Sequence, residues 1–170
     1  MRGFFASLLT MLVLAGCASQ QPLPPRPPLA DITAFALNGR IAVRQGETRH
    51  YVKIDWRHAP AYDAILLATP LGQGVAEIER DAAGARLTLA DQRRFVAEDW
   101  GTLTEQIFGF RLPLQASARW LLGEVKDAEG WRIRVVEREA DATDALPTVI
   151  ELERDDILVR LKIDEWSDVR

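Results

Sequence analysis

The sequence predicts a mainly β domain, in which a curved antiparallel sheet carries helices across its concave face. Three observations favour this fold class. Apolar and polar residues alternate with period two through residues 35–44, which is typical of a strand with one buried and one exposed face. About eight or more short segments of this kind recur at a spacing of roughly eight to twelve residues. Helical spacing interrupts them once, between residues 100 and 122, so the helices are expected to cover one side of a continuous sheet.

The first three segments predict three consecutive strands. Residues 35–44 form the first strand, Gln45-Gly46-Glu47 a turn, and residues 51–57 a second strand with the same alternation. The third segment, residues 62–69, is apolar on both faces. We therefore expect the third strand to be central and covered on its second side.

The turn after the third strand carries an apolar residue where turns are normally polar. Pro70 presets its backbone for a turn, and Gly72 and Gly74 are expected to supply positive φ on either side of Gln73. The residue at the tip is Leu71. Two interpretations stay open: Leu71 folds back over the hairpin or a neighbouring loop, or it faces outward as a small apolar probe for a membrane or a partner.

The middle of the chain predicts three short strands followed by two helices. The strands cover residues 76–79, 87–89 and 94–96. Helical spacing from Trp100 to Phe110 predicts the first helix, with Thr102 and Glu105 as a capping box and Gly109 at its end. A shorter helix is expected over residues 115–122, and three further strands over residues 131–137, 149–153 and 157–164.

The first sixteen residues are a predicted targeting segment. Arg2 gives a positive start, and residues 4–15 are an apolar run too short to span a bilayer core of about 30 Å. The run ends in Leu14-Ala15-Gly16-Cys17, which matches the lipobox pattern of bacterial lipoproteins. We expect cleavage before Cys17 and acylation of this single cysteine. The alternative is an ordinary signal peptide with a chance cysteine.

The residues after Cys17 predict a location and a tether. An aspartate after the acylated cysteine is the usual signal for retention in the inner membrane, but this chain has Ala18. We therefore expect the inner leaflet of the outer membrane, with the folded part in the periplasm. Residues 17–30 contain five prolines, which predicts an extended tether, and residues 31–170 are long enough for one domain.

The charge balance excludes some partners. Without Arg2 the chain has 20 Lys and Arg against 25 Asp and Glu, so nucleic acid is not an expected partner and bulk charge does not attract the chain to anionic lipid. Any membrane contact is expected to be apolar and local.

No pattern for catalysis or for a cofactor is found. His50 and His58 are too few and too close in sequence for a persuasive metal site or triad. No serine of the mature chain lies in a Gly-x-Ser-x-Gly motif, and Gly72-Gln73-Gly74 lacks the third glycine of a dinucleotide site. The single cysteine excludes an internal disulfide and a cysteine zinc site. The sequence predicts a protein that is not an enzyme and has no metal or cofactor.

The tryptophans are the remaining candidates for a site. Trp56 and Trp131 lie on inward faces of predicted strands, Trp166 ends the last strand, and Trp100 and Trp120 lie on the helices. Core packing accounts for each of them. Alternatively, a space beneath the helices that side chains do not fill would be an apolar cavity with tryptophan walls.

Over nearly its whole length the chain resembles the LolB family, the outer-membrane lipoprotein receptors of Gram-negative bacteria. The order and spacing of several segments carry the resemblance: the lipobox at Cys17, Leu37-Asn38-Gly39-Arg40-Ile41-Ala42, the Trp56 strand end, Leu66-Leu67-Ala68-Thr69-Pro70-Leu71-Gly72, Leu112-Pro113-Leu114, Trp120-Leu121-Leu122-Gly123, Gly130-Trp131, Leu146-Pro147 and Glu165-Trp166. The polar tail after Trp166 and the proline-rich tether depart from the family pattern.

The resemblance implies an unclosed antiparallel β-barrel whose helices cover an apolar cavity for the acyl chains of a lipoprotein. It implies the periplasmic carrier LolA as donor and outer-membrane phospholipid as the destination, with Cys17 as the lipid-bearing residue and Leu71 as the leucine that delivers cargo into the membrane. The protein is expected to act as a monomer. The expected cavity wall consists of Trp56, Leu66, Trp120, Trp131 and Trp166.

Other functions stay open at this point. A structural or assembly lipoprotein would have a filled core and no place for lipid. A carrier for other lipids would look the same in sequence, because a cavity for acyl chains is largely blind to the head group. A hydrolase would need a catalytic cluster that the sequence does not display.

Overall fold

The computed structural model describes residues 26–108, 111, 114–124 and 130–170. The targeting segment, Cys17 and most of the predicted tether lie outside the described residues, as do Gly109, Phe110 and Leu112-Pro113. Among the described residues, a short 3-10 helix already lies partly inside the predicted tether. In chain order the elements are η1 (Leu29–Asp31), β1 (Phe35–Gln45), β2 (Thr48–Ala59), β3 (Tyr62–Ala68), β4 (Gly74–Asp81), β5 (Gly84–Leu89), β6 (Arg94–Ala97), α2 (Trp100–Phe108), α3 (Leu114–Leu121), β7 (Arg132–Arg138), β8 (Pro147–Arg154) and β9 (Ile157–Ser167).

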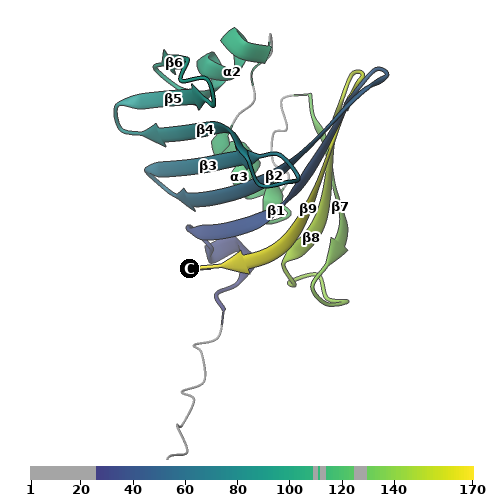
Figure 1. Cartoon of the computed structure of the whole chain (residues 1–170). Helices are drawn as coiled ribbons and strands as arrows, with labels where there is room; N and C mark the ends of the chain where they lie inside the picture. The colour runs from purple at the N-terminus through teal and green to yellow at the C-terminus, as the bar shows by residue number, and fades with distance from the viewer. Residues whose placement is uncertain (1–25, 109–110, 112–113, 125–129) are drawn as a thin grey trace, which may run out of the picture.

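The strands form one antiparallel sheet of nine strands in the order β6-β5-β4-β3-β2-β1-β9-β8-β7. Its two edges, β6 and β7, do not pair with each other, so the sheet is curled but not closed. Figure 1 shows α3 within the curl, behind β1 and β2, and α2 beside β5 and β6. The predicted fold class, a curved and unclosed antiparallel sheet with two helices, is confirmed.

The first and last strands are neighbours near the middle of the sheet. β1 pairs with β2 over its full length and with β9 on its other side, with a register shift between Asn38 and Gly39. A side chain at Gly39 would collide with the backbone oxygen of Lys162. Glycine is therefore required where β9 passes closest to β1.

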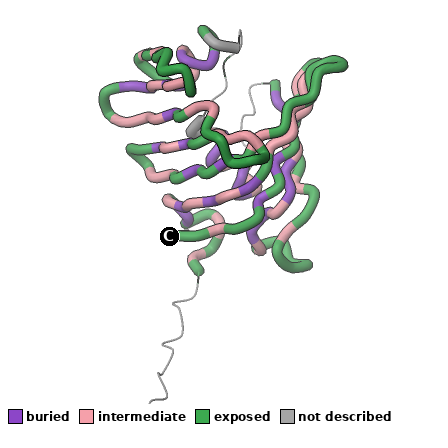
Figure 2. The backbone as a smooth tube through the Cα atoms, in the orientation of Figure 1, coloured by how far each residue is buried: buried purple, intermediate pink, exposed green. Residues whose placement is uncertain are grey.

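Alternation along the strands places the apolar side chains on the concave face. In β1, Phe35 and Leu37 are each 2% exposed, while the intervening Ala36 and Asn38 are half-buried. Figure 2 shows the same alternation of buried and exposed residues in the other strands of the curl. The core of the domain is the layer between this concave face and α3.

The third strand corrects one prediction. β3 is an interior strand, but its convex face is uncovered: Leu66 is 48% exposed although its neighbour Ile65 is 6% exposed. A run of apolar residues on both faces therefore did not indicate burial on both sides. The predicted cover over β3 is wrong.

The start of α2 and the β3–β4 turn each correct one more prediction. The backbone N–H of Thr102 donates to Asp99 Oδ1 at 2.7 Å, so Asp99 caps α2 and the predicted capping box of Thr102 and Glu105 is wrong. The N–H bond is stronger to the ionised carboxylate than to the neutral acid, and for that reason the pKa of Asp99 is lowered. In the β3–β4 turn only Gly72 has positive φ, at 91°; Gly74 does not, and it begins β4.

Candidate functional site

The turn between β3 and β4 presents Leu71 to solvent with 91% of its surface exposed. Thr69 organises the turn: its backbone N–H donates to the Gln73 carbonyl at 2.8 Å and its carbonyl accepts from Gly72 N–H at 2.8 Å. Its hydroxyl accepts a third bond from Gln73 N–H at 3.2 Å. A turn with three such bonds holds Leu71 away from the sheet, so Leu71 does not fold back over the hairpin.

Three of the predicted wall residues lie in the buried core. Trp56 is 4% exposed, Trp120 1% and Trp131 5%, and the half-buried Trp166 packs against the same cluster. They come from β2, α3, the residue just before β7, and β9. The fold therefore brings together tryptophans from four distant segments of the chain.

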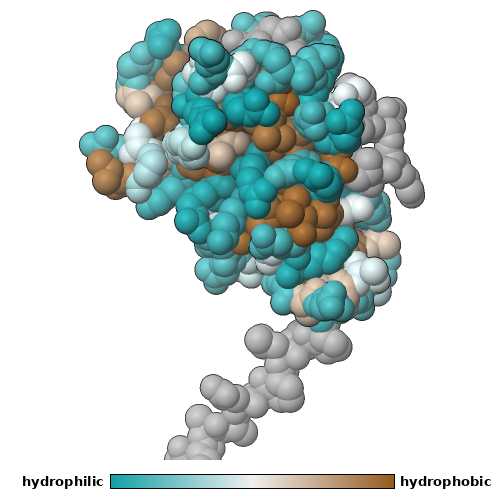
Figure 3. All heavy atoms as spheres, turned by 90° about the vertical axis from the view of Figure 1, so that its right-hand side faces the viewer, coloured by the Kyte–Doolittle hydropathy of each residue, from teal (hydrophilic) through white to brown (hydrophobic). Residues whose placement is uncertain are grey.

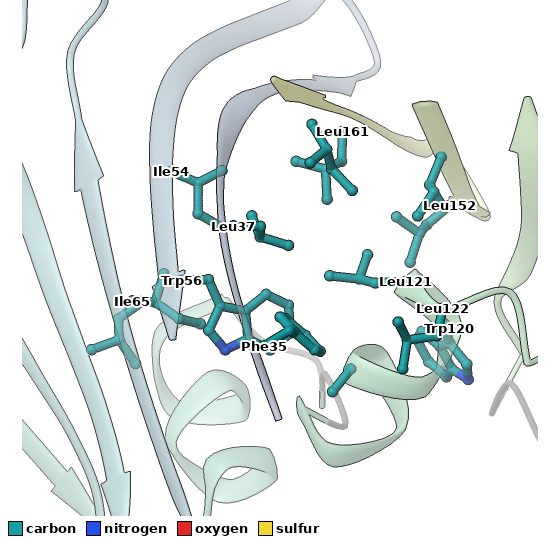
Figure 4. Close-up of a cluster of buried hydrophobic side chains, with 14 of the residues drawn as sticks. Phe35, Leu37, Ile54, Trp56, Ile65, Trp120, Leu121, Leu122, Leu152 and Leu161 are labelled. Carbon is teal, nitrogen blue, oxygen red and sulfur yellow. The ribbon is translucent and has the colours of Figure 1, made fainter. Parts of the chain in front are cut away.

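Side chains from the sheet and from α3 point toward one another across the concave face. Figure 4 shows Leu121 of α3 facing Leu37 of β1 and Leu161 of β9, with Trp56 at one side. All four are less than 7% exposed. In this structure α3 occupies the concave face, and the tryptophans are packed in its contact with the sheet.

Leu66 does not belong to this group. It pairs across β2 with Asp55 and across β4 with Glu77, and its side chain is 48% exposed on the convex face. Because side chains alternate along a strand, Leu66 points to the other face of the sheet from its neighbour Ile65. The position assigned to Leu66 as a wall of the concave-side cavity is therefore wrong.

An aromatic group joins the strands at one end of the concave face. The Phe35 ring lies 5.6 Å from Trp56, 5.1 Å from Trp166 and 5.0 Å from His58, centroid to centroid. The Trp166 Nε1–H donates to the Pro147 carbonyl at 2.8 Å. These contacts fix the two tryptophans against β1 from both sides.

Asp63 is a buried site residue that the sequence reasoning missed. It is 1% exposed, and its carboxylate accepts bonds from Trp56 Nε1 at 2.9 Å, His58 Nδ1 at 2.6 Å and Arg80 Nε at 2.6 Å. An ion pair of this depth is stable only when its remaining donors and acceptors are satisfied. The signal was present, since Asp63 occupies an inward position of β3, in line with Ile65 and Leu67.

Arg119 of α3 ties the helix to the beginning of the domain. Its guanidinium donates to the Ile32 carbonyl at 2.7 Å and to the Ala30 carbonyl at 3.2 Å, and it forms an ion pair with Glu124 at 2.5 Å. Ile32 is itself 1% exposed. The segment just before β1 is therefore bound to the same helix that fills the concave face.

Exposed apolar residues are found on several parts of the surface. The large ones are Tyr51, Tyr62, Leu66, Leu71, Val96 and Val136. Figure 3, which views the molecule from the β7 side, shows apolar areas bordered by hydrophilic side chains. Leu71 is the most exposed of the six, since the next, Val96, is 64% exposed.

The described part of the chain offers neither a metal site nor a membrane-spanning helix. Its His, Cys, Asp and Glu side chains form no group of three or more that could hold a metal ion. None of its helices combines the length and the apolar character needed to cross a membrane. The predicted lipid-bearing Cys17 lies outside the described residues.

Comparison with known proteins gives a consistent result. Residues 33–166 match the family model described as outer membrane lipoprotein LolB. The outer-membrane lipoprotein LolB of Chromobacterium violaceum is 34% identical over 171 residues, covering 92% of this chain and 94% of the relative. Those of Azoarcus sp. and Dechloromonas aromatica are 31% and 33% identical, covering 98% and 99% of this chain and 96% and 99% of the relatives. A solved structure of a LolA superfamily protein from Nitrosomonas europaea aligns with a TM-score of 0.45 at 7% identity, covering 81% of this chain and 86% of that one.

Proposed function

The chain belongs to the LolB family of outer membrane lipoproteins, whose role is the localisation of lipoproteins at the outer membrane, and from this we propose a receptor mechanism with three parts. The chain is anchored through an acylated Cys17 and accepts lipoproteins from the periplasmic carrier LolA. It holds their acyl chains at the concave face of the sheet. It then inserts them into the inner leaflet of the outer membrane with the help of Leu71.

The need for such a receptor follows from the cost of exposing acyl chains to water. Each buried methylene is worth about 0.8 kcal/mol, so releasing one long acyl chain into water costs on the order of 10 kcal/mol. A lipoprotein must therefore pass from one apolar site to another and then to the bilayer. If each site in the series binds the acyl chains more tightly than the one before it, the transfer requires no nucleotide.

The observation that carries the proposal is the exposure of Leu71. A leucine that is 91% exposed on a turn held by three hydrogen bonds contributes little to the core. Burying it in lipid is worth roughly 1.5 to 3 kcal/mol. This is too little to anchor a protein, but enough to seat a tethered domain against the acyl region of a leaflet.

The proposed acyl site lies between the concave face and α3. Trp56, Trp120, Trp131 and Trp166 would form its walls, and they support the proposal because all four belong to one core cluster or pack against it. Since α3 packs on the concave face, acyl chains would replace the packing of Leu121 against the sheet. Entry of cargo would therefore require α3 to move outward.

A transfer assay tests the proposal. The chain from Ala18 onward retains every described strand and helix, and it is mixed with lipoprotein-loaded LolA and then with phospholipid vesicles. We expect Leu71→Glu to take cargo from the carrier as the parent does and to fail to pass it to vesicles. Val96→Glu, which places the same charge on another exposed apolar residue, is the matched control and should transfer normally.

The two halves of the proposal fail separately. Normal delivery to vesicles by Leu71→Glu would remove the role of Leu71 in insertion. No uptake of cargo by the well-folded parent domain would remove the receptor mechanism and favour an assembly lipoprotein with a filled core.

A further inference from the structure

Three cations stand side by side on the convex face, across three adjacent strands. The pairing register places Arg40 of β1 directly opposite Lys53 of β2 on one side and Lys162 of β9 on the other. All three are exposed. Two residues further along β1, Ala42 stands between Tyr51 and Arg160 in the same way. The β2–β1–β9 part of the convex face is therefore locally basic.

Between β7, β8 and β9 of the same sheet, several facing charges have opposite signs. Glu151 of β8 pairs with Arg134 of β7 and with Arg160 of β9, and Glu153 pairs with Arg132 at 3.0 Å. Like charges directly opposite each other destabilise a sheet, whereas opposite charges stabilise it. The row of three cations therefore costs stability, and folding alone does not explain it.

Two members of the row have no counter-charge. Arg40 donates to Asp164 at 2.6 and 3.0 Å, and this carboxylate raises the pKa of Arg40. Lys53 and Lys162 form no ion pair with any residue that the structure describes. The nearest acidic residues of this face along their strands, Asp55 and Asp164, both lie toward one end of it. The two lysines are thus left available to an external anion.

The cations surround a shallow apolar hollow of about 400 Å³ next to the Leu71 turn. Ala42 and Tyr51, whose side chains share the convex face with the three cations, line it together with Pro70 of the turn. Arg40, Lys53 and Lys162 line it as well, and so does Arg160. A hollow with apolar and cationic lining, beside an exposed leucine, matches the boundary of a leaflet, where acyl chains meet phosphates.

We infer that this hollow is a docking surface for membrane phospholipid, in which Lys53 and Lys162 hold head-group phosphates while Leu71 enters the acyl region. The inference rests on the proposed function, because it assumes that Leu71 meets a leaflet. The net charge of −4 does not oppose it, since charges further away than a Debye length of about 8 to 10 Å are largely screened. The surface would orient the domain so that the turn, and the cargo site behind it, face the membrane.

Vesicle binding tests the inference. The chain from Ala18 onward is sedimented with vesicles of phosphatidylcholine alone and of phosphatidylcholine mixed with phosphatidylglycerol. Each lysine near an anionic surface contributes a factor of about five, so Lys53→Gln with Lys162→Gln should lower partitioning onto the mixed vesicles roughly 25-fold at about 0.1 M salt. Partitioning onto phosphatidylcholine should change little.

Matched variants separate charge at this surface from charge in general. Arg94→Gln with Arg132→Gln removes two exposed charges from the edge strands β6 and β7 and should leave partitioning near that of the parent. Lys53→Arg with Lys162→Arg should restore binding to the mixed vesicles. Equal urea midpoints for all variants would show that a loss of folding does not cause the differences in vesicle partitioning.

Other occupants give different results. Unchanged partitioning of the Lys53→Gln, Lys162→Gln variant would overturn the inference. The inference would also be overturned if inorganic phosphate displaced the protein from vesicles more strongly than chloride does at equal ionic strength. That result would indicate a site for free phosphate. Loss of cargo uptake from LolA with intact vesicle binding would indicate a protein-docking surface. If the lysine effect holds but the parent takes no cargo from LolA, the proposed function fails alone.

Discussion

The concave and convex faces of this sheet are built from the same strands but differ in burial. In β3, Ile65 is 6% exposed on the concave face and Leu66 is 48% exposed on the convex face. In β2, the buried Trp56 alternates with Asp55 and Arg57, which are exposed. Burial in the core explains the apolar residues of the concave face. It does not explain Leu66 on the convex face or Leu71 at the turn, because both are exposed. We therefore expect stability to depend on the concave face, and the proposed membrane contact to depend on the convex face and the Leu71 turn.

The largest effect on stability is expected on the concave face, at Trp120. Its side chain is 1% exposed in the contact of α3 with the sheet. Trp120→Ala should lower the free energy of unfolding by about 3 to 5 kcal/mol, because it removes a large buried side chain and leaves a cavity. Urea unfolding measures this value.

The control for Trp120 is an aromatic residue of the convex face. Tyr51 is 60% exposed, and Tyr51→Ala should change the free energy of unfolding by no more than about 0.5 kcal/mol. Equal losses from the two variants would contradict the division of roles between the faces.

A smaller effect is expected at the cap of α2, which lies beside β5 and β6. Asp99 accepts the Thr102 N–H at 2.7 Å, and Asp99→Ala should cost about 1 kcal/mol. Since the folded-state pKa of Asp99 is lowered, mainly by this bond, the ionised cap stabilises the fold above the unfolded pKa of about 3.9. That stability is lost as the pH falls through the folded pKa.

Urea midpoints of the parent and of Asp99→Ala should therefore converge as the pH falls from neutrality to below about 4. A constant difference at all pH values would mean that the carboxylate is not the stabilising group. Thr102→Ser, which retains the backbone donor, is the control and should preserve the pH dependence.

The smallest effect is expected at Leu66. Leu66→Ala should change stability by less than about 1 kcal/mol, while the matched Ile65→Ala should cost about 2 to 5 kcal/mol. Cargo uptake should be unaffected by Leu66→Ala, because its side chain is on the face opposite the proposed acyl site. Loss of uptake with intact folding would return Leu66 to the cavity wall.

Much of the fold could be predicted because strand alternation is a local property of the sequence. The alternation in residues 35–44 and 157–164 predicted β1 and β9 within a few residues of their observed ends. Leu71 was a candidate for the same reason, since a leucine between Pro70 and Gly72 contradicts ordinary turn chemistry.

Other features depend on contacts between distant segments. Whether the second face of β3 was covered depended on the positions of α2 and α3, and both pack on the concave side only. The N-cap of α2 proved to be Asp99, three residues earlier than the predicted Thr102. Competing caps within one turn are close in energy, and packing selects between them.

The strand pattern, the two helices, the apolar residue at the turn and the resemblance to the family could all be read from the sequence. The exposure of Leu71 and the position of β9 beside β1 were visible only in the folded chain, and that position places Lys162 in one row with Arg40 and Lys53 although it follows Arg40 by 122 positions. The same pairing set Phe35 between Trp56 and Trp166. The physical reason is that side-chain alternation is encoded within each strand, whereas strand order and register are set by the packing of the whole sheet.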